Sequence, residues 1–117
     1  MYVLGGNITN LVTLNYNQKL KANIINFLAH GIYIGESAGS IFLSDDTKYC
    51  YDIKKGIKEK YNVNLESYAG LGLIDIKIIP HFNKADDNLK NRINKYEKEN
   101  NQMITRMNDG DIIYYSL

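Results

Sequence analysis

The chain has 117 residues, of which 44% are hydrophobic and 23% are charged, and its formal net charge is +1. This length and composition are typical of one globular domain with a buried core, so we expect a single domain over residues 1–117. The near balance of charges excludes the strongly basic surface that attracts nucleic acids or anionic membranes, and we expect neither as a partner.

Cys50 is the single cysteine of the chain, which excludes both an internal disulfide and a C-x-x-C pair of metal ligands. The residues from Met1 to Gly6 lack the basic start and long apolar run of a secretory signal. Apolar runs elsewhere have the length of strands and are too short to span a membrane. These features predict a cytoplasmic protein without a metal site.

Short apolar runs alternate with helical patterns in the first half of the chain. The run Tyr2-Val3-Leu4 predicts a buried strand that ends in a tight turn at Gly5-Gly6-Asn7. Apolar residues at helical spacing predict an amphipathic helix over 18–30. A second short strand is expected over 32–34, and a helix is expected from 38 to 43.

The second half is less regular. A Lys-rich stretch favours a surface helix over 51–61. Gly56 lies inside this stretch and makes the helix less stable, so the prediction is weak. Alternating apolar residues predict a strand over 74–79, which Pro80 ends. The last expected elements are a helix over 87–100 and a C-terminal hairpin, in which strands over 103–106 and 112–115 flank the turn Asn108-Asp109-Gly110.

This alternation predicts an α/β fold with a parallel sheet and helices packed on its faces. Ligands of such sheets bind beyond the carboxyl ends of the strands. Three polar or glycine-rich segments follow predicted strands, namely Gly5-Gly6-Asn7, Gly35 to Gly39, and His81-Phe82-Asn83. We therefore expect these three loops to meet at one edge of the sheet.

The segment Gly35-Glu36-Ser37-Ala38-Gly39 matches the G-x-S-x-G pattern, in which a serine occupies a sharp turn between a strand and a helix. The turn exposes the hydroxyl and points the backbone N–H of Ala38 toward the place where an oxyanion would form. An ordinary turn has the same composition. The strand pattern before the segment and the helix pattern after it favour Ser37 as a nucleophile.

A serine nucleophile needs a neighbouring base, and the chain offers His30 and His81. His30 lies at the end of a predicted surface helix, where interaction with the helix dipole is its expected role. His81 directly follows a predicted buried strand, at the edge where Ser37 is expected. The sequence therefore favours His81 as the general base.

A carboxylate should orient the imidazole and stabilise its charged form. Asp109 is the preferred candidate, although Asp-Gly is also a strong former of hairpin turns for reasons of backbone geometry alone. Spacing does not separate this residue from the alternatives Asp75, Asp86 and Asp111.

Three segments resemble the successive signature segments of the dipeptidase E and cyanophycinase family of serine peptidases. They are YVLGGN, YIGESAGS and GLGLIDIKIIPHFN, and their order and separation match as well. The resemblance implies the three-layer α/β sandwich of the class I glutamine amidotransferase-like, or flavodoxin-like, architecture. Relatives carry further strand and helix units before the glycine segment, so the chain corresponds to the C-terminal catalytic part of the family's domain.

The resemblance also implies roles for individual residues. The family's nucleophile corresponds to Ser37, its base to His81 and its acidic residue to Asp109, where some relatives have glutamate. The backbone N–H groups of Gly6 and Ala38 correspond to the two oxyanion donors. The implied activity is hydrolysis of small peptides, including acidic dipeptides, through an acyl-enzyme and without a cofactor.

The chain departs from the family's pattern in two ways that affect the expected activity. The arginine that reads an acidic substrate residue in aspartyl dipeptidases has no secure match, although Lys90 and Arg92 lie nearby in the sequence. Without its neighbours in the family's sheet, the apolar strand Tyr2–Leu4 would be an edge, which predicts self-association or pairing with a missing N-terminal segment.

Two interpretations from other classes stay open. An inactive remnant could keep the fold and bind a partner instead of cleaving a peptide. An amidotransferase-like domain shares the general architecture, but such domains use a cysteine where this chain has Ser37.

Overall fold

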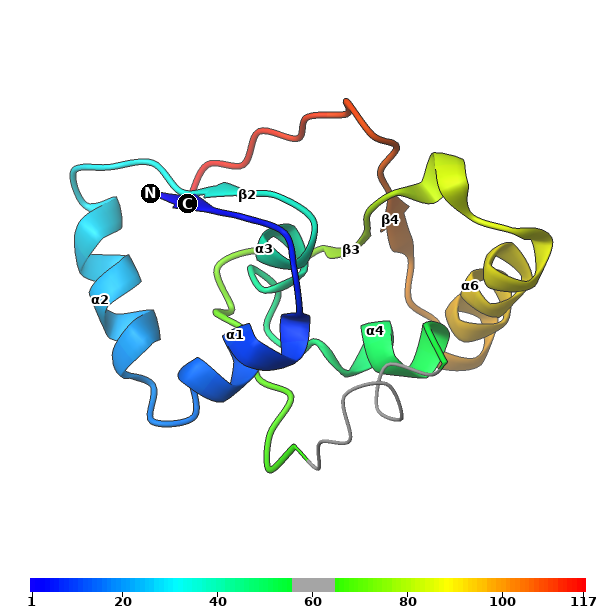
Figure 1. The fold of residues 1–117 in the computed structure, drawn as a ribbon, viewed down its shortest axis with the longest axis horizontal. Helices are drawn as coiled ribbons and strands as arrows, with labels where there is room; N and C mark the ends of the chain where they lie inside the picture. The colour runs from blue at the N-terminus through cyan, green and yellow to red at the C-terminus, as the bar shows by residue number, and fades with distance from the viewer. Residues whose placement is uncertain (56–64) are drawn as a thin grey trace.

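The computed structural model describes residues 1–55 and 65–117, which form an α/β fold. Figure 1 shows α2 and α6 at opposite ends of the molecule, with α3 between them and the C-terminal segment arching over the top. The elements are β1 Tyr2–Val3, α1 Ile8–Leu14, α2 Lys19–Leu28, β2 Ile34–Gly35, α3 Ala38–Ile41, α4 Lys48–Ile53, β3 Lys77–Ile79, the 3-10 helix η1 Phe82–Lys84, α6 Asp87–Asn100 and β4 Ile104–Arg106.

The described strands form two small parallel sheets. β1 pairs with β2 in the register Tyr2 opposite Ile34, and β3 pairs with β4 in the register Lys77 opposite Ile104. An isolated parallel bridge between Ser44 and Ile74 lies outside both sheets. The predicted parallel pairing is confirmed. The loops that follow β1, β2 and β3 lie at the carboxyl ends of these strands, which is where ligands of parallel sheets bind.

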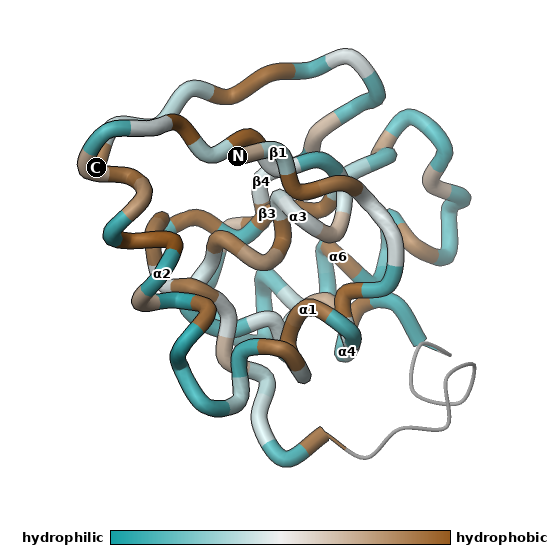
Figure 2. The backbone as a smooth tube through the Cα atoms, turned by 60° about the vertical axis from the view of Figure 1, so that its left-hand side comes forward, coloured by the Kyte–Doolittle hydropathy of each residue, from teal (hydrophilic) through white to brown (hydrophobic). Residues whose placement is uncertain are grey.

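The core lies around α3, with side chains from α1, α4, α6 and the β3–β4 sheet. All four residues of α3 are buried. Figure 2 shows that apolar segments also occur on the outside of the fold, including the C-terminal segment. The largest fully buried side chains are Tyr49, Phe42, Ile24, Ile53, Leu71, Ile79, Ile93, Ile104, Val12, Asn15, Thr47 and Cys50.

Two of the predicted helices are confirmed with close bounds. α2 covers most of the range 18–30, and α6 has the predicted bounds 87–100. The Asp86 carboxylate accepts a hydrogen bond from the Leu89 N–H and caps α6, while Asn101 ends the helix in the left-handed conformation with φ 48°. Local signals at both ends therefore fix this helix.

Other elements differ from the prediction. α1 was not predicted, and it forms because the Asn7 side chain caps it at Thr9 while Ile8 and Val12 enter the core. The helix predicted over 51–61 falls partly on residues outside the described ranges. Within those ranges, α4 begins earlier, at Lys48, and ends at Ile53.

The predicted C-terminal hairpin is wrong. The turn exists, since the Asp111 N–H donates to the Asn108 carbonyl at 3.1 Å, but residues 112–117 are exposed and form no strand. β4 pairs with β3 instead, and the Tyr115 hydroxyl bonds to Asp75 at 2.5 Å, which draws the segment away from β4. Tertiary pairing with β3 therefore outweighs the local preference of Asn-Asp-Gly for a hairpin.

None of the helices in residues 1–55 and 65–117 has the length and apolar character that crossing a membrane requires.

Candidate active site

Ser37 occupies the sharp turn between β2 and α3. Its backbone has φ 51° and ψ −112°, a conformation that costs a non-glycine residue energy and recurs at functional turns. The turn also brings α3 very close to β1, because a Cβ on Gly39 would lie 2.2 Å from the Val3 carbonyl oxygen. The second glycine of G-x-S-x-G is thus required by this close approach.

The glycine loop after β1 lies directly beside Ser37. A Cβ on Gly5 would lie 2.9 Å from the Ser37 Cβ, so only a residue without a side chain fits there. Gly6 follows with φ 144°, a conformation that favours glycine. The loop therefore brings backbone, rather than side chains, to the serine.

His81 follows Pro80 at the end of β3 and adopts the left-handed conformation with φ 59° and ψ 30°. Its Nε2 lies 2.9 Å from the Ser37 Oγ. The next residue fixes this turn, because the Phe82 N–H donates to the Met107 carbonyl at 2.9 Å. The loop after β3 is thereby tied to the loop after β4, which carries Asp109.

Asp109 completes a chain of hydrogen bonds. Its Oδ1 lies 2.5 Å from the His81 Nδ1, while Oδ2 lies 2.7 Å from the Lys84 Nζ. Lys84 and then His81 lower the pKa of Asp109 from 3.8 to about 2, so the carboxylate is ionised at neutral pH. An ionised carboxylate can only accept, so the His81 Nδ1 is the donor to Asp109. In the tautomer that carries its proton on Nδ1, Nε2 can accept a hydrogen bond from the Ser37 hydroxyl.

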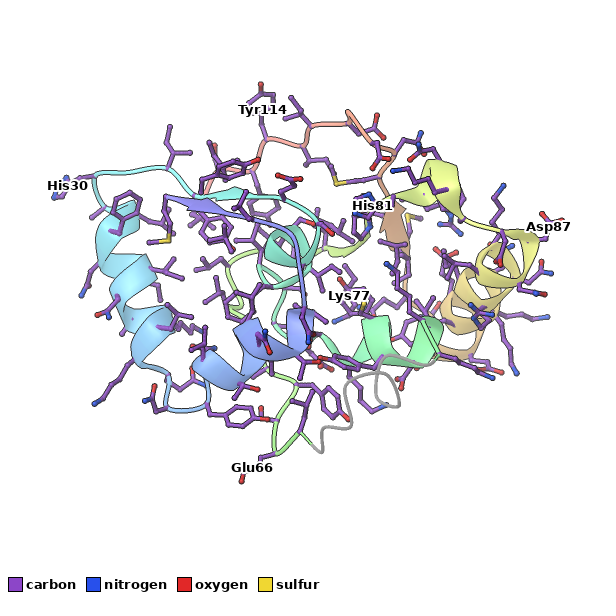
Figure 3. All side chains as sticks on the ribbon, in the orientation of Figure 1. His30, Glu66, Lys77, His81, Asp87 and Tyr114 are labelled. Atoms are coloured by element: carbon purple, nitrogen blue, oxygen red, sulfur yellow. The ribbon has the colours of Figure 1, made fainter. Side chains whose placement is uncertain are left out.

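The carboxylates that spacing left as alternatives have hydrogen-bond partners other than His81. Asp75 bonds to Tyr115, Asp86 caps α6, and the Asp111 carboxylate accepts the Asn108 N–H at 2.7 Å. Figure 3 shows His30 on the far side of the molecule from His81. Geometry therefore distinguishes Asp109 from the other carboxylates, which spacing could not do.

The two basic residues near the expected specificity position also have other contacts. The Lys90 Nζ lies over the Phe82 ring, 5.7 Å from its centroid, and the Arg92 Nε donates to the Ile53 carbonyl at 2.7 Å. Neither lines the cavity that contains Ser37.

A groove of about 1210 Å³ surrounds these side chains. We call it the Ser37 groove; its walls include residues 31–37, Pro80 with His81, Lys84, and the C-terminal segment 107–117. The His81 and Asp109 side chains are 43% and 36% exposed, so the groove is open to solvent. Within residues 1–55 and 65–117, no group of three or more His, Cys, Asp or Glu side chains could hold a metal ion.

Sequence reasoning missed three residues beside these groups. Asn83 and Lys84 both contact Asp109, and the Tyr2 hydroxyl bonds to the Glu36 carboxylate next to Ser37. Their position within three residues of His81 was a signal for the first two. Nothing in the spacing indicated the contact between Tyr2 and Glu36, because parallel pairing of β1 with β2 creates it.

Comparison with known proteins gives consistent matches. The model of Peptidase family S51 matches residues 1–116. The uncharacterized peptidase Lmo0363 of Listeria monocytogenes is 37% identical over 91 residues, which are 73% of this chain and 40% of that protein.

A solved structure with the same fold is also similar to the chain. It is a 1.5 Å crystal structure of a protein assigned as a peptidase E, from Listeria monocytogenes EGD-e, with a TM-score of 0.72 and 24% identity. The match covers 99% of this chain and 58% of that one. The chain thus spans about half the length of the proteins that it matches. With the family match over nearly its whole length, it belongs to Peptidase family S51.

Proposed function

We propose that the chain carries the active site of a serine-type peptidase, which hydrolyses peptide bonds of small peptides through Ser37, His81 and Asp109. The observation that carries the proposal is one continuous hydrogen-bond chain, with 2.9 Å from Ser37 Oγ to His81 Nε2 and 2.5 Å from His81 Nδ1 to Asp109 Oδ1. Membership of a peptidase family supports it.

In the proposed reaction, the Ser37 Oγ attacks the peptide carbonyl carbon while His81 Nε2 takes the hydroxyl proton. The C–N bond then breaks, and the imidazolium returns that proton to the leaving amine. Water then attacks the acyl carbon while His81 Nε2 takes one of its protons. The bond from that carbon to the Ser37 Oγ breaks, the imidazolium returns the proton to Oγ, and the acid is released. Asp109 stays ionised throughout and stabilises the imidazolium.

The oxyanion formed in each step needs donors that are already in place. We assign this role to the backbone N–H groups of Ala38 and Gly6. The N–H of Ala38 supports the assignment because the first N–H groups of a helix have no acceptor within it. Gly6 belongs to the loop whose preceding residue, Gly5, lies against Ser37.

Acidic dipeptides are the finer proposal for the substrate. Among the described residues that line the Ser37 groove, Lys84 is the one Lys or Arg side chain, so it is the available partner for a substrate carboxylate. Its ammonium is already paired with Asp109 at 2.7 Å. Acidic and neutral dipeptides should therefore be compared directly.

Further expectations accompany this function. We propose that residues 1–117 are the catalytic part of one α/β domain, that the complete sheet has the three-layer arrangement, and that the protein is cytoplasmic. We also propose self-association, or pairing with an N-terminal segment, along the exposed β1 strand. Cell fractionation followed by sedimentation of the recovered protein would test the location and the association together.

The second candidate is an inactive remnant that binds a partner. The amidotransferase alternative lacks support, since the nucleophile position holds Ser37 instead of cysteine.

Release of free amino acids from a panel of dipeptides with Asp, Ala or Leu at the first position tests the function. We expect hydrolysis that disappears in Ser37→Ala, with Ser40→Ala as the control because Ser40 instead bonds to the Ser37 carbonyl at 2.6 Å. Hydrolysis that persists in Ser37→Ala would refute the assignment of the nucleophile, and a wild-type protein without turnover would favour the remnant.

A further inference from the structure

The Asp109 side chain is exposed to solvent, although its proposed role is to orient the His81 imidazole. It is 36% exposed and lies on a turn, so nothing in the core restrains its rotation. Orientation matters here, because the carboxylate must present one oxygen to the His81 Nδ1. A carboxylate that rotated freely in water would hold the imidazole poorly, so another restraint is needed.

Asn83 and Lys84 supply such a restraint from the 3-10 turn η1. The Asp109 N–H donates to the Asn83 Oδ1 at 2.8 Å, and the Asn83 Nδ2 donates to the Asp109 Oδ2 at 3.5 Å. The Lys84 Nζ lies 2.7 Å from the same Oδ2. One carboxylate oxygen is thus occupied by Asn83 and Lys84, which leaves Oδ1 for His81.

We infer that Asn83 and Lys84 are positioning residues, which hold the Asp109 carboxylate against His81. The inference rests on the proposed function of Ser37, His81 and Asp109. The two residues lie two and three positions after His81 in the chain, so one short turn carries the base and also the groups that orient its carboxylate. The turn is itself fixed by hydrogen bonds from Lys84 N–H to the His81 carbonyl at 2.9 Å and from Phe82 N–H to the Met107 carbonyl at 2.9 Å.

Asn83 and Lys84 differ in their effect on the charge around Asp109 and His81. The charged or titratable groups that face Asp109 from η1 are His81 and Lys84, and Asp111 follows on its own turn with its carboxylate on the Asn108 N–H. Lys84 contributes a positive charge beside the Asp109–His81 pair, whereas Asn83 contributes only hydrogen bonds. Removing Lys84 should therefore make protonation of the imidazole easier, and removing Asn83 should not.

The rate at which an uncharged fluorophosphonate labels Ser37, measured against pH, tests the inference. Lys84→Met and Asn83→Ala should each lower the maximal rate by roughly 10-fold to 100-fold, the scale expected when a catalytic group is displaced. Probe affinity should not change. The acid limb of the profile should move to higher pH in Lys84→Met and stay in place in Asn83→Ala, and Lys84→Arg should restore most of the rate.

A charge-matched control is Lys95→Met, because Lys95 pairs with Glu99 on α6. This variant should leave both the rate of Ser37 labelling and its pH profile unchanged. If Lys84→Met instead labels at the wild-type rate with an unmoved acid limb, the inference is wrong, and Lys84 is free to bind an acidic substrate.

Carbon-13 NMR of the Asp109 carboxyl gives a readout that needs no catalysis. The wild-type pKa should lie near 2, and it should rise toward its ordinary value of 3.8 in Lys84→Met. An unchanged titration would refute the restraint even in a protein that is not labelled. Absence of wild-type labelling together with the expected titration change would refute the proposed function and leave the restraint standing.

Discussion

The two small sheets of this molecule differ greatly in burial. In β3 and β4, Ile78, Ile79 and Ile104 are 4%, 0% and 1% exposed, whereas Tyr2 of β1 and Ile34 of β2 are 59% and 56% exposed. The proposed base and its carboxylate follow the buried pair of strands, and the proposed nucleophile follows the exposed pair. The site is therefore assembled across two regions of unequal packing.

The buried helix α3 connects these regions. It packs against both β2 and β3, and the Tyr33 hydroxyl donates to the Gly39 carbonyl at 2.9 Å. Ser37 is the N-cap residue directly before this helix, so its position depends on the helix more than on the exposed strands. Burial of α3, rather than pairing of β1 with β2, therefore keeps Ser37 within hydrogen-bond distance of His81.

The largest expected effect concerns the carboxylate on the buried side. Asp109→Asn keeps the Asn-Gly or Asp-Gly turn geometry, but it should slow Ser37 chemistry by roughly 10⁴-fold, because an amide favours the wrong imidazole tautomer. Initial rates of labelling or hydrolysis would measure this. Wild-type turnover in the variant, with an unchanged fold by circular dichroism, would make Asp109 purely structural.

The difference in packing can be tested with two matched truncations. Ile79→Ala should lower the free energy of unfolding by about 2–5 kcal/mol because it opens a cavity in the core. Ile34→Ala removes the same atoms from an exposed site and should change it by about 0.5 kcal/mol or less. Urea unfolding of both variants gives the comparison, and equal losses would mean that the β1–β2 sheet is covered in solution.

Pairing of a second copy along the exposed β1 strand of that sheet is the proposed association. Ile34→Lys should weaken it, since a charge on an exposed strand opposes edge pairing. Met103→Lys is the matched control, because Met103 is 82% exposed but precedes β4. Sedimentation at micromolar concentration should give a smaller species for Ile34→Lys alone. A wild-type protein that sediments as a monomer would contradict the proposal.

The smallest expected effect is on stability in acid. The folded-state pKa of Asp109 is lowered from 3.8 to about 2, so its ion pairs stabilise the fold fully above pH 3.8 and are lost as the pH falls to about 2. The difference in unfolding free energy between wild type and Asp109→Asn should shrink across this interval. A constant difference would mean that the contacts with Lys84 and His81 do not survive in solution.

Some parts of the molecule were predictable because their signals are local. α6 has a capping aspartate at Asp86 and an apolar face, and the G-x-S-x-G turn is determined by its glycines. Parallel pairing followed from the alternation of elements. The proximity of Ser37 and His81 followed from their places in two loops at the carboxyl ends of strands.

The remainder depends on contacts between residues distant in the sequence. The turn at Asn108-Asp109-Gly110 predicted a hairpin, but β4 gains more by pairing with buried β3, and Tyr115 bonds to Asp75 instead. α1 was not predicted because packing of Ile8 and Val12 in the core stabilises it. The contacts of Asn83 and Lys84 with Asp109 also depend on such pairing, since β3 and β4 bring the two residues to it. Their place within three residues of His81 was the one local signal.

Mass spectrometry of the protein after reaction with a fluorophosphonate tests the central claim most directly. A serine in a strained turn beside a neutral histidine is nucleophilic, and an ordinary turn serine is not. We predict that the peptide containing Ser37 carries the added mass and that His81→Ala loses it. An unlabelled wild-type protein, or labelling that is unchanged in His81→Ala, would contradict the account of Ser37 as a nucleophile activated by His81.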